Sequence, residues 1–130
     1  MKELRKGYRS HVDLPVYEQA FQCAAQVFQL SKQFPKEELY SLTDQIRRSS
    51  RSVCANIAEA WRKRRYEKHF CSTLNIAEAE AAETQVWLQF AVDAEYIDRK
   101  TAAELYAQYE QVLAQLVHLI RNPSPWIISS

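Results

Sequence analysis

The residues best suited to chemistry are arginines and lysines that gather in one stretch of the chain. Residues 36–68 hold nine Lys or Arg against five Asp or Glu, a balance of +4, whereas residues 69–110 hold two against eight, a balance of −6. A guanidinium offers paired donors to a phosphate, and each neutralised phosphate releases counterions, so the basic stretch favours a polyanionic partner. The residues expected to bind nucleic acid are Arg47, Arg48, Arg51, Arg62, Lys63, Arg64, Arg65 and Lys68.

Helical spacing brings three of these arginines together. At about 100° per residue, Arg47, Arg51 and Arg62 fall within about 60° of one another and more than about 100° from the apolar seam of the same helix. Four consecutive cations, residues 62–65, then crowd a turn, where like charges repel one another unless an anion arrives. A second interpretation stays open: the cations pair with nearby carboxylates, or keep a helix face solvated, at about 0 to 1 kcal/mol each.

Patterns typical of catalysis or metal binding are missing from the sequence. The three histidines, His11, His69 and His118, lie in separate segments without the spacing of metal-binding helices. The single glycine, Gly7, excludes the glycine-rich phosphate loops of nucleotide-binding enzymes. We therefore expect a protein that is not an enzyme and has no cofactor or metal ion.

Length and composition are those of one packed domain. The chain has 130 residues, of which 47% are hydrophobic and 12% aromatic. It contains neither a membrane-spanning apolar run nor the apolar middle of a signal peptide, so a cytoplasmic location without membrane contact is expected. The three cysteines, Cys23, Cys54 and Cys71, are widely spaced and are expected as reduced thiols of the core.

The apolar repeat is helical throughout and predicts four helices. Their expected ranges are Pro15 to before Phe34, about Tyr40 to Lys63, about Glu67 to Glu95, and a cap at Asp98 or Thr101 to before Asn122. Connections of about 3 to 8 residues favour antiparallel neighbours. The sequence therefore predicts an all-α, antiparallel up-down-up-down four-helix bundle over residues 15–122, with an N-terminal arm (1–14) and a docked C-terminal tail (123–130).

Apolar residues outside the expected seams indicate self-association. The third helix carries a second apolar stripe with Trp87 and Phe90, and the tail carries Trp126 and Ile127, which a solitary monomer should not leave in water. These four residues are the expected oligomer interface. For the tail, docking on its own bundle and docking on a neighbouring subunit both stay open. Glu83, on the same side of its helix as Trp87, is expected to find a donor in Arg47, Arg48 or a serine of the second helix.

Several segments resemble one protein family. Residues 34–64, FPKEELYSLTDQIRRSSRSVCANIAEAWRKR, together with residues 69–88 and residues 94–97, are similar to the four-helix bundle proteins encoded in intervening sequences of bacterial 23S ribosomal RNA genes. The resemblance covers about residues 14–120. Its most recognisable pieces are Gln45-x-Arg47-Arg48, Asn56-Ile57-Ala58-Glu59, Arg62, Ile76-Ala77 and Glu83.

The resemblance implies a bacterial, non-catalytic bundle that assembles into a ring, typically a homopentamer, and associates with nucleic acid. Structural relatives of that family include accessory variability proteins of diversity-generating retroelements, which bind nucleic acid and associate with a reverse transcriptase. The implied partners are other copies of the chain, RNA or a DNA/RNA hybrid, and a reverse transcriptase. As an alternative, the same cations meet an acidic partner, so that the protein is a protein–protein interaction module.

Two departures from the family pattern affect these expectations. Ala60 stands where the family usually has glycine, and Ala79-Glu80 replaces a common Gly-Ser pair, so helix packing is expected to differ locally. The net charge of the whole chain is only +1, which argues against strong RNA affinity. No base readout is expected, because no aromatic stacking platform is recognisable in the sequence.

Overall fold

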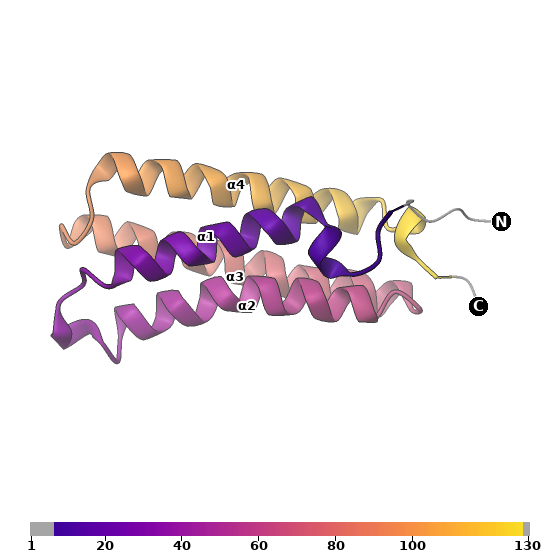
Figure 1. Ribbon diagram of the computed structural model, residues 1–130, viewed down its shortest axis with the longest axis horizontal. Helices are drawn as coiled ribbons and strands as arrows, with labels where there is room; N and C mark the ends of the chain where they lie inside the picture. Colours follow the sequence, from indigo (N-terminus) through magenta and orange to yellow (C-terminus); the bar gives the residue numbers. More distant parts are fainter. Residues whose placement is uncertain (1–6, 129–130) are drawn as a thin grey trace.

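The structure is a computed structural model of the 130-residue chain and describes residues 7–128. Four long helices lie side by side, each antiparallel to the next (Figure 1). They are α1 (Pro15–Ser31), α2 (Leu42–Arg62), α3 (Glu67–Asp93) and α4 (Arg99–Arg121), with short 3₁₀ turns η1 (His11–Asp13), η2 (Lys36–Glu38) and η3 (Ser124–Trp126). The predicted antiparallel four-helix bundle is confirmed. Within residues 7–128, no helix combines the length and the apolar composition that a membrane span requires.

Local sequence sets where the helices begin. Pro15 occupies the first position of α1, where the missing N–H of proline costs no hydrogen bond. The Asp98 carboxylate accepts a hydrogen bond from the Thr101 N–H at 2.9 Å, which makes Asp98 the cap of α4 and Thr101 a residue of its first turn. The predicted helix ranges agree with the observed ones to within two residues, because these caps and the intervening prolines mark the ends.

The core is one continuous seam between the four helices. Its fully buried members include Val27 of α1, Ile46, Val53 and Ile57 of α2, Leu74 and Leu88 of α3, and Leu105, Tyr109 and Leu116 of α4. Buried alanines of α3, such as Ala77 and Ala81, permit close approach of neighbouring helices. The hydroxyls of Ser49 and Thr84 join α2 to α3 through a hydrogen bond of 2.8 Å.

The three cysteines are free thiols. Burial raises the pKa of Cys23 to about 12 and that of Cys54 to about 11, so both side chains stay protonated at neutral pH. Cys71 is half-buried, and its thiol faces the carbonyl oxygen of Ile120 in α4 at 3.7 Å. Cys23 and Cys54 therefore behave as small apolar residues of the core, as the sequence predicted.

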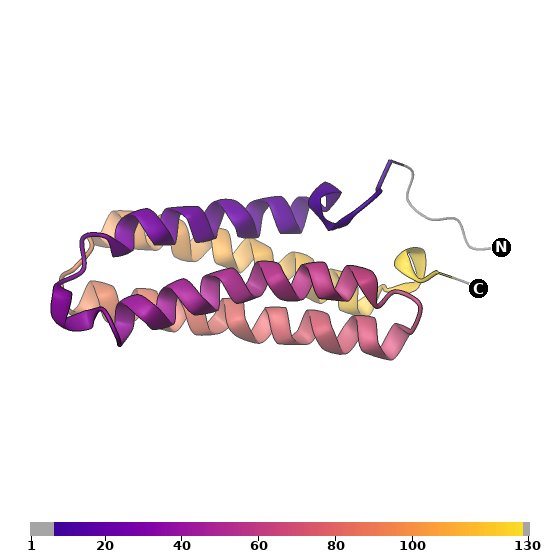
Figure 2. The same cartoon turned by 60° about the horizontal axis from the view of Figure 1, so that its bottom comes forward.

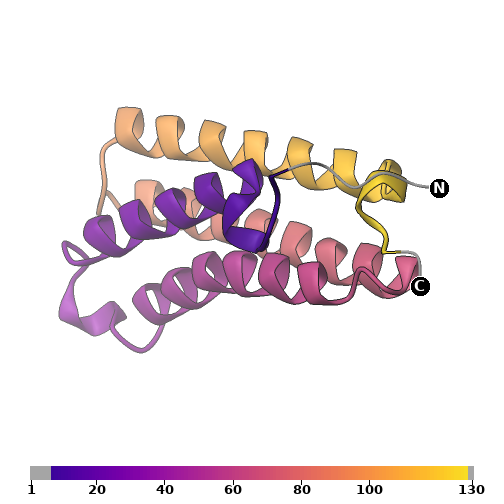
Figure 3. The ribbon, with the colours of Figure 1, turned by 45° about the vertical axis from the view of Figure 1, so that its right-hand side comes forward.

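The C-terminal tail folds back across the end of its own bundle (Figure 3). Trp126 is only 7% exposed, and its ring lies edge-on to the rings of Tyr8 and Trp61, with centroids 5.1 and 6.1 Å away. The Ile128 N–H donates to the Arg64 carbonyl oxygen at 3.0 Å. Of the two alternatives for the tail, the structure thus shows docking on its own bundle, and the ring of Trp126 is covered by its own chain.

Candidate nucleic-acid interface

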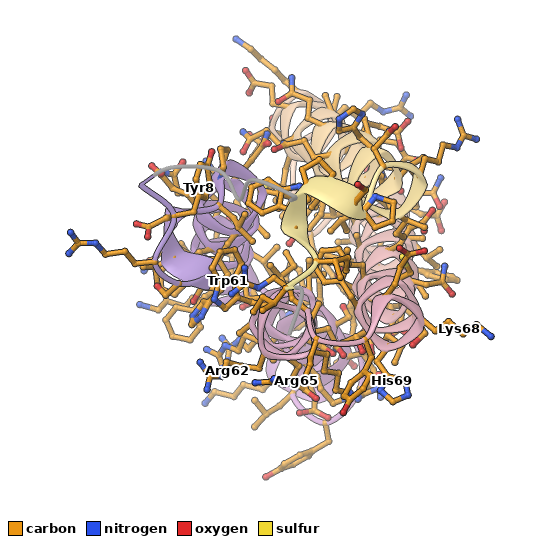
Figure 4. The ribbon with its side chains drawn as sticks, turned by 90° about the vertical axis from the view of Figure 1, so that its right-hand side faces the viewer. Tyr8, Trp61, Arg62, Arg65, Lys68 and His69 are labelled. Atoms are coloured by element: carbon orange, nitrogen blue, oxygen red, sulfur yellow. The ribbon has the colours of Figure 1, made fainter. Side chains whose placement is uncertain are left out.

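Most of the predicted cations lie around the turn between α2 and α3, at the bundle end that also carries the tail (Figure 1). We call Arg62, Lys63, Arg64, Arg65 and Lys68 the turn cluster. All of them except Arg64 are exposed. Viewed onto this end, Arg62, Arg65 and Lys68 follow one another around the rim, and the Lys68 side chain extends away from the molecule (Figure 4). The short turn thus concentrates positive charge at one end of the bundle.

Arg64 is held against the protein. Its guanidinium carbon lies 3.6 Å from the centroid of the Trp61 ring, and its Nε donates to the Trp61 carbonyl oxygen at 2.8 Å. Burial, with a contribution from the charge of Arg62, lowers the pKa of Arg64, although a guanidinium stays charged in any protein setting. Because its carbonyl oxygen also accepts from Ile128, Arg64 links the turn to the tail.

A second group of cations surrounds Phe28 of α1. The guanidinium carbons of Arg47 and Arg51 lie 4.7 and 5.4 Å from the centroid of its ring, and the Lys32 Nζ lies 4.9 Å away. Arg47 is half-buried and donates through Nε to the Ser31 Oγ at 2.7 Å. We call these three cations, Lys32, Arg47 and Arg51, the Phe28 cluster. They come from two elements, because Lys32 caps the end of α1 and the two arginines belong to α2. Two members of the predicted row on α2, Arg47 and Arg51, therefore face α1, and not solvent alone.

Neither cluster is neutralised by the described part of the chain. Among residues 7–128, no Lys or Arg nitrogen of either cluster lies within 4.0 Å of a carboxylate oxygen. Arg48, exposed on α2, likewise has no carboxylate partner there. Within residues 7–128, these cations are therefore not consumed by ion pairs, and of the second interpretation only the solvated helix face stays open. Like charges held this close repel one another, and an incoming anion relieves that repulsion.

Four side chains of this surface were missed by the sequence interpretation. Lys32 and Phe28 belong to α1, and only the pairing of α1 with α2 brings them to the arginines. Tyr66 and His69 lie in the basic turn, with ring centroids 5.5 Å apart and planes inclined by 57°. Their spacing of three residues at the start of a helix was the available signal. The structure therefore brings two exposed aromatic rings together within the basic turn, where the sequence showed no recognisable stacking platform.

The remaining predicted interface residues lie apart from the cations. Trp87 and Phe90 are neighbours near the end of α3, with ring centroids 5.9 Å apart, and Phe90 is 56% exposed. With Tyr40 and Leu42 they border a shallow groove of about 480 Å³. Ile127 is half-buried in the tail, at the opposite end of the bundle.

The carboxylates of α3 have other partners than those expected. Glu83 accepts from the Nε1 of Trp87, one turn further along its own helix, at 3.1 Å. The serine of α2 that meets an α3 carboxylate is Ser52, which donates to Glu80 at 3.1 Å. The predicted partner of Glu83 was therefore wrong, because the indole of Trp87, four residues further along the same helix, donates to this carboxylate. Within residues 7–128, no group of three or more His, Cys, Asp or Glu is placed to hold a metal ion.

These features define a class of protein: an all-α four-helix bundle whose cations gather on α2, on the adjoining edge of α1 and at the α2–α3 turn. The chain belongs to the 23S rRNA-intervening sequence protein family, which matches residues 12–118. The resemblance stated from the sequence is thereby confirmed.

One solved structure illustrates the likeness. It is the crystal structure of a protein of unknown function from the S23 ribosomal protein family of Bacteroides thetaiotaomicron. The two chains are 30% identical and superpose with a TM-score of 0.74, over 82% of this chain and 96% of the other. No curated protein sequence matches this chain.

Proposed function

We propose that the protein is a non-catalytic, ring-forming scaffold that binds RNA or a DNA/RNA hybrid through the turn cluster and the Phe28 cluster. One observation carries this proposal: the cations of both clusters lack a carboxylate partner among residues 7–128. Such cations gain most from phosphates, because binding replaces mutual repulsion with attraction and releases counterions from the nucleic acid.

The two clusters suit a strand that runs along α2. Arg47 and Arg62 belong to the same helix and are fifteen residues apart, so they lie about 22 Å apart along its axis. A sugar-phosphate backbone that lies along this edge would contact the Phe28 cluster at one point and the turn cluster further along α2. Such contacts go to phosphates, which position a strand without reading its sequence. We therefore expect the contacts made by these cations not to distinguish one base from another.

Self-association is the second part of the proposal. The groove beside Trp87 and Phe90 exposes apolar surface at the end of the bundle opposite the turn cluster. A second copy that covers this surface would leave the cations open. Repetition of one contact around a closed axis forms a ring, and it would repeat the turn cluster once per subunit, which multiplies a modest local charge.

The proposal is tested by reversing two exposed charges of the turn cluster. We expect the double variant Arg62→Glu/Arg65→Glu to bind a short single-stranded RNA at least about tenfold more weakly. The slope of log affinity against log salt should also become less steep by about 1.4, which corresponds to two lost phosphate contacts. Fluorescence anisotropy over a salt series measures both quantities.

The matched control reverses two exposed cations at the other end of the bundle. Arg99→Glu/Lys100→Glu changes the net charge by the same amount but should leave affinity close to that of the unmodified protein. Circular dichroism checks that both variants remain helical. Equal losses in the two variants, or binding that ignores salt, would contradict the proposed interface.

The near-neutral total charge favours one alternative. A net charge of +1 gives weak long-range attraction to polyanions, and this suits a basic surface that docks on an acidic protein, such as a reverse transcriptase. In that case, the purified protein should retain a protein partner without nucleic acid, and free RNA should not compete for that partner.

A further inference from the structure

We infer that Tyr66 and His69 form a stacking platform for an unpaired base, so that the basic turn selects single-stranded nucleic acid over duplex. This inference rests on the proposed function and adds to it the class of strand that is bound. The aromatic rings of the turn would contact bases, whereas the cations of the turn would contact phosphates.

The platform is exposed but its backbone is fixed. Tyr66 is 60% exposed, and His69 is exposed as well. Tyr66 is the residue from which α3 starts: its N–H donates to the Lys63 carbonyl oxygen at 3.1 Å, and its own carbonyl oxygen accepts from the Phe70 N–H at 2.9 Å. Phe70 is buried in the core, so its side chain fixes the first turn of α3 to the bundle. A base can therefore be received without prior ordering of the turn.

The two rings share one side of this first turn. Residues three apart on a helix are neighbours, and the centroids of Tyr66 and His69 are 5.5 Å apart. Water in contact with an exposed aromatic ring is unfavourable in free energy. A base stacked on the ring would remove this apolar surface from water. Base stacking on aromatic side chains supplies a large share of affinity in proteins that bind single strands.

Cations stand where the phosphates of a stacked nucleotide would lie. Arg65 directly precedes Tyr66 in the chain, and Lys68 directly precedes His69. Seen onto the end of the bundle, His69 lies between Arg65 and Lys68 on the rim (Figure 4). A single nucleotide offers a ring face and a charged backbone side by side. The alternation of cations and rings in this turn matches that chemistry.

The same rings cannot stack on bases within a duplex. Paired bases cover one another's faces, so a protein reaches a duplex mainly through its backbone and grooves. An unpaired base is free to turn its face to a side chain, and every base has such a face. The platform therefore predicts a preference for single strands without a preference among bases.

An exposed tyrosine at the other end of the bundle lacks this setting. Tyr40 is 90% exposed at the other end of the bundle, yet no aromatic ring or cation within residues 7–128 contacts its ring. It is a tyrosine of the same kind outside the turn cluster. The Tyr40→Ala variant is therefore the matched control for the loss of an exposed aromatic side chain. Because Tyr40 borders the groove beside Trp87 and Phe90, light scattering checks that this variant keeps the mass in solution of the unmodified protein.

The test compares four labelled probes on the full-length protein at one salt concentration. They are an oligouridylate and an oligothymidylate of about 12 nucleotides, an abasic deoxyribose-phosphate strand of the same length, and an RNA duplex of the same length. The unmodified protein should bind both base-bearing strands more tightly than the abasic strand and the duplex. The ratio between the oligouridylate and the oligothymidylate shows whether RNA or DNA is the better source of the unpaired base.

The variant Tyr66→Ala/His69→Ala should lose about 5- to 100-fold in affinity for the two base-bearing strands. Its affinity for the abasic strand and for the duplex should stay unchanged, because the phosphate-binding cations are intact. Tyr66→Phe should bind like the unmodified protein, since stacking uses the ring and not the hydroxyl. Circular dichroism verifies that each variant is folded.

Each outcome separates stacking from charge. If Arg62→Glu/Arg65→Glu weakens binding while Tyr66→Ala/His69→Ala binds the oligouridylate normally, the stacking platform is wrong and the proposed function stands. If the unmodified protein binds none of the four probes, both proposals fail, and an acidic protein is the better partner. Equal affinity of the unmodified protein for base-bearing and abasic strands also overturns the platform, as does an equal loss for Tyr40→Ala at unchanged mass in solution.

Discussion

The Tyr109 hydroxyl lies in the buried core of the bundle. The side chain is fully buried in α4, and its Oη has no hydrogen-bond partner in the described part of the chain. Burial raises the pKa of this phenol strongly, so it stays neutral. A buried polar atom without a partner costs about 1 to 3 kcal/mol.

We therefore expect Tyr109→Phe to raise the free energy of unfolding by about 1 kcal/mol. The substitution removes the unpartnered oxygen and leaves the ring, so no large cavity forms. Urea denaturation followed by circular dichroism measures the change. A loss of stability would mean that the hydroxyl makes a favourable interaction in solution.

Glu95 is the one residue other than glycine with positive φ in residues 7–128, at 64°. It follows α3 in a Schellman turn, in which the Tyr96 N–H donates to the Ala91 carbonyl oxygen at 2.9 Å. A side chain in this left-handed conformation costs about 1 to 2 kcal/mol, which glycine avoids.

Glu95→Gly should therefore stabilise the protein by about 0.5 to 1 kcal/mol, after the greater freedom of glycine in the unfolded chain is subtracted. The expected readout is a higher midpoint of thermal unfolding. Ala94→Gly, one residue earlier at φ −81°, is the control and should lower the midpoint. If both variants shift the midpoint downwards, the conformational penalty at Glu95 is not the dominant effect.

At the scale of elements, the helices could be predicted well because their signals are local. Proline at the start of α1 and aspartate at the cap of α4 act within a few residues of the chain, so no knowledge of packing is needed. The angular row of Arg47, Arg51 and Arg62 follows from the helical repeat in the same way.

The contacts of each helix face could not be predicted. They depend on which helices pair and on how far the paired helices are shifted along the bundle axis. The side of α2 that carries Arg47 was expected to face solvent, and it meets Phe28 because α1 packs there. Glu83 was expected to reach across to α2, but Trp87 of its own helix is closer. Such contacts depend on how the helices pack against one another. The spacing of residues within one helix does not predict that packing.

The docked tail is the element whose contribution is easiest to measure. We expect Trp126→Ala to destabilise the protein by about 3 kcal/mol, because a buried tryptophan that contacts Tyr8 and Trp61 leaves a cavity. Urea denaturation gives the loss, and amide hydrogen exchange of Ile128 should speed up as its hydrogen bond to Arg64 opens.

Trp126→Phe is the conservative comparison and should lose less stability, since much of the aromatic contact remains. If Trp126→Ala unfolds at the same urea concentration as the unmodified protein, the tail contributes nothing to the stability of the bundle.

At the scale of the whole molecule, the apolar groove beside α3 is the proposed contact between copies of the chain. If Phe90 is part of the contact between subunits, Phe90→Asp should reduce the mass in solution to that of one chain, 15.2 kDa. The variant should remain folded, because Phe90 projects from the surface. Light scattering coupled to size exclusion measures the mass.

Val12→Asp is a control of equal exposure, since Val12 and Phe90 are both 56% exposed. Val12 lies in η1, near the opposite end of the bundle, so its substitution should leave the assembly intact. A ring that persists in Phe90→Asp would place the subunit contact on another face.

The two ends of the bundle carry opposite charge. The α1–α2 and α3–α4 connections lie together at one end (Figure 2), where residues 36–44 and 93–100 hold six acidic and three basic residues. Residues 62–68, at the other end, hold five basic residues and one acidic residue. The protein is thus an electric dipole along its long axis, although its net charge is close to zero. In the field of a polyanion it experiences a torque that turns the basic end forward before contact, and this pre-orientation fades once salt shortens the range of the field to about 10 Å.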